Sequence, residues 1–206
     1  MSKDWFRNTS WNDAIARSFY EKLARAGHKE QYLRIQASHL VSTHPDVSVD
    51  LLNQYFELPD QFDQAQAYVD RARALLRLGH IEAAIESYEA ALAREASFPS
   101  LQTQAWLDLP FLIATRRIAA SYERAVELLE TFHARLMFPI DHFKWHAAQS
   151  LIAAERQDHG AARHHALLAI ESAESEDSGY PHHRSVGLVG EQYLEVRRRL
   201  ERYGKA

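Results

Sequence analysis

The sequence predicts an all-α protein built as an α-solenoid, in which about four helix-turn-helix pairs stack one on the next. Between Phe62 and Pro99, apolar residues recur at spacings of three and four on both sides of Gly79. This is the pattern of two consecutive amphipathic helices. Helix breakers are few, with seven glycines and six prolines. The intervals between them suit helices rather than the short strands of a β-sandwich.

The pair around Gly79 supplies a template that recurs along the chain. In it the small residue Ala84 is followed by Tyr88 and then by Ala91. Three further matches are Ser48 with Leu52 and Tyr55, Ala125 with Leu129 and Phe132, and Ala162 with Ala166 and Ala169. Neighbouring matches lie about 36 to 41 residues apart, close to the period that paired helices require. Four helix pairs therefore account for residues 29–174.

A single capping helix is expected at each end of the array. Residues 1–28 carry an apolar stripe behind a predicted capping box of Ser10 and Asp13. Residues 186–206 carry a second apolar stripe, formed by Val189, Tyr193, Val196 and Leu200. Its outer side is strongly charged through Glu191, Glu195, Arg198, Arg199 and Arg202. A stacked array needs terminal helices with one polar side, because the last pair would otherwise expose apolar surface. Residues 1–206 are thus expected to form one helical-repeat domain.

Some segments depart from the regular pattern. Residues 175–185 are rich in turn formers and predict an irregular connection. Pro110 falls inside a helical pattern, so we expect the helix to bend or divide near Asp108 to Pro110. The apolar run from Trp106 to Ile113 is expected to be buried. Trp5 and Phe6 are expected to pack against the first helix pair.

Composition excludes several classes of protein. The net charge is −4 and basic residues are scattered among acidic ones, so we expect no nucleic-acid partner. No run approaches the roughly 20 apolar residues of a membrane span, and the first ten residues lack a signal-peptide pattern. We therefore expect no membrane partner and a cytoplasmic location. The chain has no cysteine, which removes disulfides and thiolate metal sites. Nothing in the sequence indicates a cofactor or an oligomeric state.

The run from Gly79 to Leu92 resembles the second helix of the tetratricopeptide repeat, and residues 62–94 fit that family best. The resemblance implies a right-handed solenoid whose partners are proteins or peptides rather than reacting small molecules. In such proteins the first helices of successive pairs line a concave groove. The groove positions that this match implies are Gln31, Arg34, Ser38, Gln66, Val69, Arg73, Arg77, Arg117 and Lys144.

The cations among these groove positions favour an acidic peptide or a C-terminal carboxylate as the partner, because arginine and lysine form charge-assisted hydrogen bonds with carboxylates. The alternative is that these cations pair with aspartate and glutamate of the same chain. The family's clamp for a terminal carboxylate uses lysine and asparagine, whereas the corresponding positions here are Arg34, Ser38, Asp70 and Phe111. A chaperone-tail clamp is therefore not expected.

The expected function is that of a non-enzymatic scaffold, adaptor or regulator. The sequence leaves a second function open, a metal-assisted hydrolase, because His142 and His146 are four residues apart on a predicted helix and His164, His165, His182 and His183 follow. No Glu completes a His-Glu-x-x-His motif, and Phe143 and Trp145 are typical packing residues. A third alternative is the regulation of a cognate toxin or transcription factor through the same groove.

Overall fold

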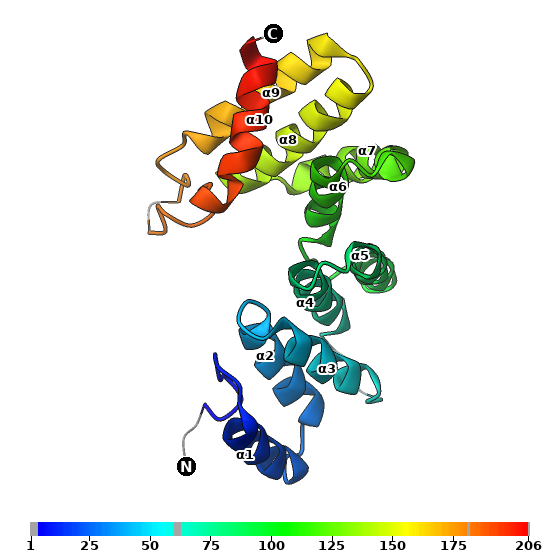
Figure 1. The fold of residues 1–206 in the computed structure, drawn as a ribbon, viewed down its shortest axis with the longest axis vertical. Coiled ribbons are helices and arrows are strands. Elements are labelled where there is room, and N and C mark those ends of the chain that lie inside the picture. The colour runs from blue at the N-terminus through cyan, green and yellow to red at the C-terminus, as the bar shows by residue number, and fades with distance from the viewer. Residues whose placement is uncertain (1–3, 60–62, 181, 206) are drawn as a thin grey trace. The chain divides into compact units, whose positions relative to one another are not determined.

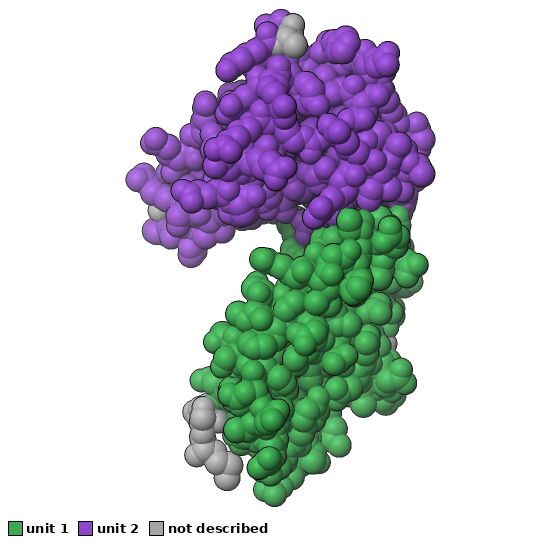
Figure 2. All heavy atoms as spheres, in the orientation of Figure 1, with its two compact units in different colours: residues 1–105 green, residues 106–206 purple. Residues whose placement is uncertain are grey.

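The computed structural model describes residues 4–59, 63–180 and 182–205. The chain is all-α and 72% helical, and the described residues contain ten α-helices and no strand. They form two compact units, residues 1–105 and residues 106–206 (Figure 2). The all-α fold class predicted from the sequence is confirmed. The single domain expected over residues 1–206 stays a prediction.

Unit 1 contains five helices, which pack against their neighbours in the chain (Figure 1). These are α1 (Asp13–Ala24), α2 (Lys29–Leu40), α3 (Pro45–Phe56), α4 (Gln64–Arg77) and α5 (Ile81–Ser97). Helix α2 packs along α3, and α4 packs along α5. Helix α4 also contacts both α3 and α2, so the two pairs of unit 1 lie directly against each other.

Unit 2 contains five more helices and three short 3-10 turns. The helices are α6 (Ala105–Arg116), which begins at the last residue of unit 1, α7 (Tyr122–Thr131), α8 (Pro139–Glu155), α9 (His159–Ala173) and α10 (Leu194–Lys205). The turns are η1 (Ala119–Ser121), η2 (His133–Arg135) and η3 (Glu191–Tyr193). Helix α8 packs along α9, and α10 packs on both. The described residues between 29 and 174 thus contain eight α-helices, the number that four pairs require.

The recurring small residues lie in the core. Ser48, Ala84 and Ala125 are 0% exposed, and Ala162 is 2% exposed. Two serines show how closely paired helices approach, because each donates a hydrogen bond to a backbone carbonyl of the facing helix. Ser48 Oγ lies 2.9 Å from Ala37 O, and Ser150 Oγ lies 2.8 Å from Ala162 O. A large side chain at these positions would push the paired helices apart.

Three helix pairs turn in the same way between their first and second helix. In each, a residue one or two positions after the first helix has a positive φ: Gly79 (82°), Arg117 (56°) and Gln157 (63°). The next amide then donates back to the helix, as in the 2.9 Å bond from His80 N to Leu75 O and the 2.9 Å bond from Asp158 N to Ala153 O. This is the Schellman arrangement, which caps carbonyls that the helix leaves unpaired.

Gln157→Gly is expected to stabilise the protein by about 0.5–1 kcal/mol, because a side chain in the left-handed region costs about 1 kcal/mol that glycine avoids. The free energy of unfolding in urea measures this. Gly79→Ala is the matched control. An added Cβ at Gly79 meets nothing within 4 Å, so only backbone strain should act, and we expect a loss of about 1 kcal/mol. An unchanged stability in both variants would contradict the shared turn.

The N-terminal segment packs on the first helix pair, as predicted. The Trp5 ring lies 4.8 Å from the Tyr32 ring of α2 and 5.5 Å from the Phe19 ring of α1, measured between centroids. Gln36 of α2, 0% exposed, accepts from Asn8 Nδ2 at 2.7 Å and donates to Asn8 O at 2.8 Å.

The predicted capping box of Ser10 and Asp13 at the start of α1 is wrong. The cap is Asn12, whose Oδ1 accepts a hydrogen bond from Ile15 N at 3.0 Å. Asparagine is as good an N-cap as serine, and it stands directly before the first helical residue, Asp13.

Pro110 does not divide α6, which runs unbroken from Ala105 to Arg116. The proline lies in the second turn of the helix, so only the bond to the carbonyl of Trp106 is lost. The run around it is buried, as expected, with Trp106 2% and Ile113 1% exposed.

The C-terminal helix expected over residues 186–206 starts later, at Leu194, after the turn η3. Gly187, near the start of the expected range, is not helical. It has a φ of +74° and lies so close to Phe138 that a Cβ would come within 2.5 Å of the Phe138 Cβ. The described residues of the 175–185 segment contain no helix, as predicted. Residue 181 lies outside the described part.

Candidate functional site

Helices α2 and α4 contact each other and together carry all the groove positions predicted in unit 1. Gln31, Arg73 and Arg77 are exposed, and Arg34 is partly buried between the two helices. Gln66, Asp70, Arg73 and Arg77 follow one another at spacings of three and four, so they form a single stripe along α4. We call the exposed and half-buried residues among these the α2–α4 face; they are Gln31, Arg34, Gln66, Arg73 and Arg77. Val69, also predicted for the groove, is 0% exposed and belongs to the core instead.

Arg34 holds the centre of the α2–α4 face through contacts with two carboxylates, one just before α4 and one within it. Its Nε lies 2.9 Å from Asp63 Oδ2, and its Nη1 lies 3.7 Å from Asp70 Oδ2. Asp63 is the residue directly before α4, and Asp70 lies two turns further on. The positive charge of Arg34 is therefore compensated within the chain, as the alternative interpretation of the sequence expected for these cations.

Asp70 is a buried carboxylate, with 6% of its surface exposed. Burial raises the pKa of Asp70 above its usual value, because the charged form loses hydration. The hydrogen bond from Gln66 Nε2 to Asp70 Oδ1, 3.0 Å long, and the charges of Arg34 and Arg73 oppose this rise. The carboxylate thus ties the side chains of α2 and α4 into one network.

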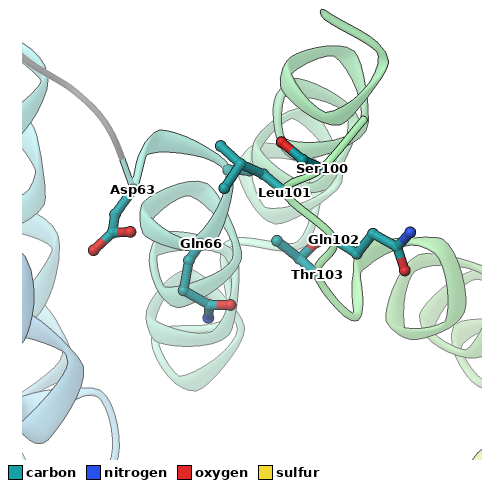
Figure 3. Close-up of a pocket in the computed structure, with 7 residues that line it drawn as sticks. Asp63, Gln66, Ser100, Leu101, Gln102 and Thr103 are labelled. Carbon is teal, nitrogen blue, oxygen red and sulfur yellow. The ribbon is translucent and has the colours of Figure 1, made fainter. Parts of the chain in front are cut away.

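A pocket of about 230 Å³ opens beside this network within unit 1 (Figure 3). Asp63, Ala65 and Gln66 of the start of α4 line one side, and Ser100 to Thr103 of the connection after α5 line the other. Glu95 of α5, 5% exposed, fixes this connection, since its Oε1 accepts from the backbone N and the hydroxyl of Thr103. The lining offers amide, hydroxyl and carboxylate groups, which suits a polar segment of a partner.

The remaining predicted groove cations lie in unit 2, and both are paired there. Lys144 Nζ of α8 lies 2.7 Å from Asp108 Oδ1 of α6, and these side chains are 14% and 9% exposed. Arg117 lies in the turn after α6 rather than on a helix, and its Nε lies 3.0 Å from Glu155 Oε1 of α8. The Lys144 pair is buried, whereas the Arg117 pair is open to solvent, with side chains 60% and 36% exposed.

Two histidines of the predicted cluster meet in unit 2, but the pairing differs from the sequence expectation. His146 of α8 pairs with His165 of α9, with 3.0 Å between their Nδ1 atoms, rather than with His142. One Nδ1 must therefore carry a proton and the other must accept it. Among the described residues, no group of three or more histidine, cysteine, aspartate or glutamate side chains is arranged to hold a metal ion.

The environment of His146 disfavours its charged form. Burial is the first cause, followed by the neighbouring His165, His142, His164 and His133, and together they lower the pKa of His146 to about 4. The pKa of His165 is lowered as well, by burial and by His164. The ring of Trp145 borders both imidazoles, with centroids 4.9 Å and 5.6 Å away. The pair therefore stays neutral near pH 7.

The neutral pair makes stability depend on pH. His146 in the unfolded chain binds its proton near pH 6.5, whereas in the folded chain it does so only near pH 4. The unfolded state holds more protons in between, so stability is highest above pH 6.5 and falls as the pH drops toward 4. Urea unfolding of the wild type and His146→Gln checks this. We expect the free energy of unfolding of the variant to decline less steeply as the pH falls. The two slopes should differ by less than about 1.4 kcal/mol per pH unit, because the imidazole is partly hydrated. Equal declines would contradict the assignment.

Comparisons with protein-family models, with curated proteins and with solved structures gave no match for this chain. None of the helices in the described ranges is both long and apolar enough to cross a lipid bilayer. The candidate site therefore rests on the geometry of the α2–α4 face and its pocket.

Proposed function

We propose that this chain is a non-enzymatic interaction module that binds a peptide or protein segment on the α2–α4 face of unit 1. In this proposal, residues 29–174 form four tetratricopeptide-like pairs in a right-handed solenoid, and the α2–α4 face is part of its concave groove. The observation that carries the proposal is the direct contact of the two first helices, α2 and α4, beside the polar pocket at the start of α4. The proposed location is cytoplasmic.

The proposed partner is an acidic segment. Arg34 is half-buried against Asp63 and Asp70, whereas Arg73 and Arg77 are exposed one turn apart on α4, where a carboxylate of the partner can reach them. Each can donate a charge-assisted hydrogen bond to a carboxylate. The pocket between Gln66 and Thr103 would receive a polar side chain next to these contacts. No nucleic acid, membrane or cofactor is part of the proposal.

Binding of peptide libraries to the immobilised full chain tests this function. Peptides with paired acidic residues should bind, and Arg73→Glu/Arg77→Glu should weaken their binding by at least about tenfold, which corresponds to about 1.4 kcal/mol. Arg17→Glu/Arg25→Glu is the matched control, because it makes the same charge change at exposed positions in or next to α1 of the same unit. Equal losses in both variants would mean that net charge, rather than the α2–α4 face, governs binding.

A further inference from the structure

The N-terminal segment is tied to α2 and to the turn that follows it. Asn8 N and Asn8 Nδ2 donate to Gln36 Oε1 at 3.1 Å and 2.7 Å, and Thr43 Oγ1 donates to Thr9 O at 2.9 Å. Asn8 Nδ2 also donates to Trp5 O at 2.8 Å, which fixes the backbone beside the indole. The segment is therefore a preorganised wall, and preorganisation lowers the cost of binding a ligand.

A pocket of about 300 Å³ opens between this segment and α1, within unit 1. We call it the α1 pocket. On the helix side it is lined by residues that recur at spacings of three and four, among them Ile15, Ser18, Phe19 and Lys22, so they share one face of α1. Its volume lies at the lower end of the range of small-molecule sites, which is roughly 300–1,000 Å³. The α1 pocket therefore has the size for a small ligand.

The floor of the α1 pocket is apolar. Phe19 is 1% exposed, and its ring centroid lies 5.5 Å from that of the partly buried Trp5. Ile15 lies one turn before Phe19 on the same face of the helix. Aromatic and aliphatic side chains of this kind line most small-molecule sites, where they contact the apolar body of the ligand.

The polar groups around this floor include donors that the chain itself does not use. The ammonium of Lys22 is partly buried, and it forms no ion pair or hydrogen bond with any residue that the structure describes. The indole N–H of Trp5 and the hydroxyl of Ser18 likewise have no hydrogen-bond partner within the described ranges. All three groups can donate, and one of them is a cation.

Asp4, the acidic residue that lines the α1 pocket, does not compensate Lys22. Its Oδ1 lies 2.8 Å from Arg7 Nη1, and its side chain is 64% exposed. The α1 pocket thus presents a positive charge and further donors beside an apolar floor. The complementary ligand carries a negative charge at one end and apolar groups over the rest.

We infer that the α1 pocket binds a small monocarboxylic acid with an apolar body. The carboxylate accepts a charge-assisted hydrogen bond from Lys22. Ser18 and Trp5 supply donors for its remaining lone pairs, and the apolar body lies against Ile15 and Phe19. This inference stands apart from the proposed function, because the α2–α4 face contributes no residue to the α1 pocket.

An NMR titration of the full chain with phenylacetate and with phenylacetamide tests the inference. The two probes share the aromatic ring and differ in charge. We expect phenylacetate to bind at least about tenfold more tightly, since only its carboxylate forms a charge-assisted bond with Lys22. The four tryptophans give separate indole N–H signals, and Trp5→Phe identifies that of Trp5. The Trp5 signal should shift the most on titration.

Lys22→Met removes the charge and keeps an apolar stem in its place. It should weaken phenylacetate binding at least about tenfold and leave phenylacetamide binding unchanged. Lys29→Met is the matched control, because it removes the same charge at the exposed first residue of α2 in the same unit. We expect it to bind both probes as the wild type does.

Equal affinity of the wild type for the acid and the amide would overturn the inference, as would the absence of saturable phenylacetate binding. These two outcomes do not depend on how a variant folds. Equal losses in Lys22→Met and Lys29→Met would also overturn it, because net charge would then govern binding. So would a hydrophobic peptide with a free C-terminus that shifts the Trp5 signal when phenylacetate does not, since the occupant would then be a protein segment.

Discussion

Asp108→Asn is expected to lower the free energy of unfolding by about 2–4 kcal/mol. The carboxylate lies 2.7 Å from Lys144 Nζ, and both side chains are largely buried, 9% and 14% exposed. Removing only the negative charge leaves the ammonium in a site of low polarity without its counter-ion. The rings of Phe111 and Tyr193, which also lie near the ammonium, attract it much more weakly than a carboxylate does.

A double-mutant cycle measured by urea unfolding separates the charge effect from packing. Lys144→Met should also destabilise, because the buried carboxylate of Asp108 loses the ammonium at 2.7 Å, whereas Asp108→Asn with Lys144→Met should recover much of the loss. Glu127→Gln is the control, since Glu127 forms an exposed ion pair with Arg124 at 2.8 Å, and its loss should cost less than about 0.5 kcal/mol. A cost at Asp108 no larger than at Glu127 would show that solvent reaches both pairs equally.

Lys144 also shows where prediction from sequence stops. The helical spacing around it indicates which residues share a face, because that spacing is local. It does not indicate that Asp108, 36 residues earlier, meets it from α6. Arg34 is a second case, since its carboxylate partners are Asp63, directly before α4, and Asp70 within α4. Both were predicted as groove cations for a partner, and in both the chain itself supplies the counter-charge.

The helices themselves could be predicted because amphipathic periodicity is a local signal. The small residue of each repeated match lies in the core, including Ser48, where the expected alanine is absent. Serine serves there because its hydroxyl can donate to the facing carbonyl of Ala37. A pattern of size and spacing therefore located the helix contacts even where the residue type departed from the family.

The turns between paired helices could be predicted from the sequence only in part. Gly79 was identified because glycine is the residue that favours a positive φ. Arg117 and Gln157 adopt the same conformation, with φ values of 56° and 63°, but neither residue type signals it. The surrounding hydrogen bonds impose the conformation, and those bonds depend on where the next helix packs.

The C-terminal helix gives a similar lesson about long side chains. Its apolar stripe was predicted to include Tyr193 and Leu200, and both do face the protein. Arg199 was placed on the solvent side, yet its guanidinium reaches the carbonyl of Thr115. An arginine can cover apolar surface with its stem and bond at its tip, so a charge on a helical wheel does not establish exposure.

Ala84→Leu is expected to cost about 1–3 kcal/mol of unfolding free energy, the second-largest effect that we predict. Ala84 is 0% exposed and lies on α5, which packs along α4. The next core positions on the same stripe of α5 are already filled by Tyr88, 2% exposed, and Ala91, 0% exposed. The added carbons therefore have no space unless α5 moves away from α4.

Ala93→Leu separates overpacking from any general effect of leucine on α5. Ala93 lies on the same helix but is exposed, and leucine is nearly as good a helix former as alanine, so we expect a change within about 0.5 kcal/mol. Thermal unfolding followed by circular dichroism compares the two variants. Each pair of a stacked array contacts mainly its neighbours, so a strained α4–α5 contact should also weaken the docking of α3 on α4. Equal melting temperatures for Ala84→Leu and the wild type would mean that the repeated pattern has been placed in the wrong register.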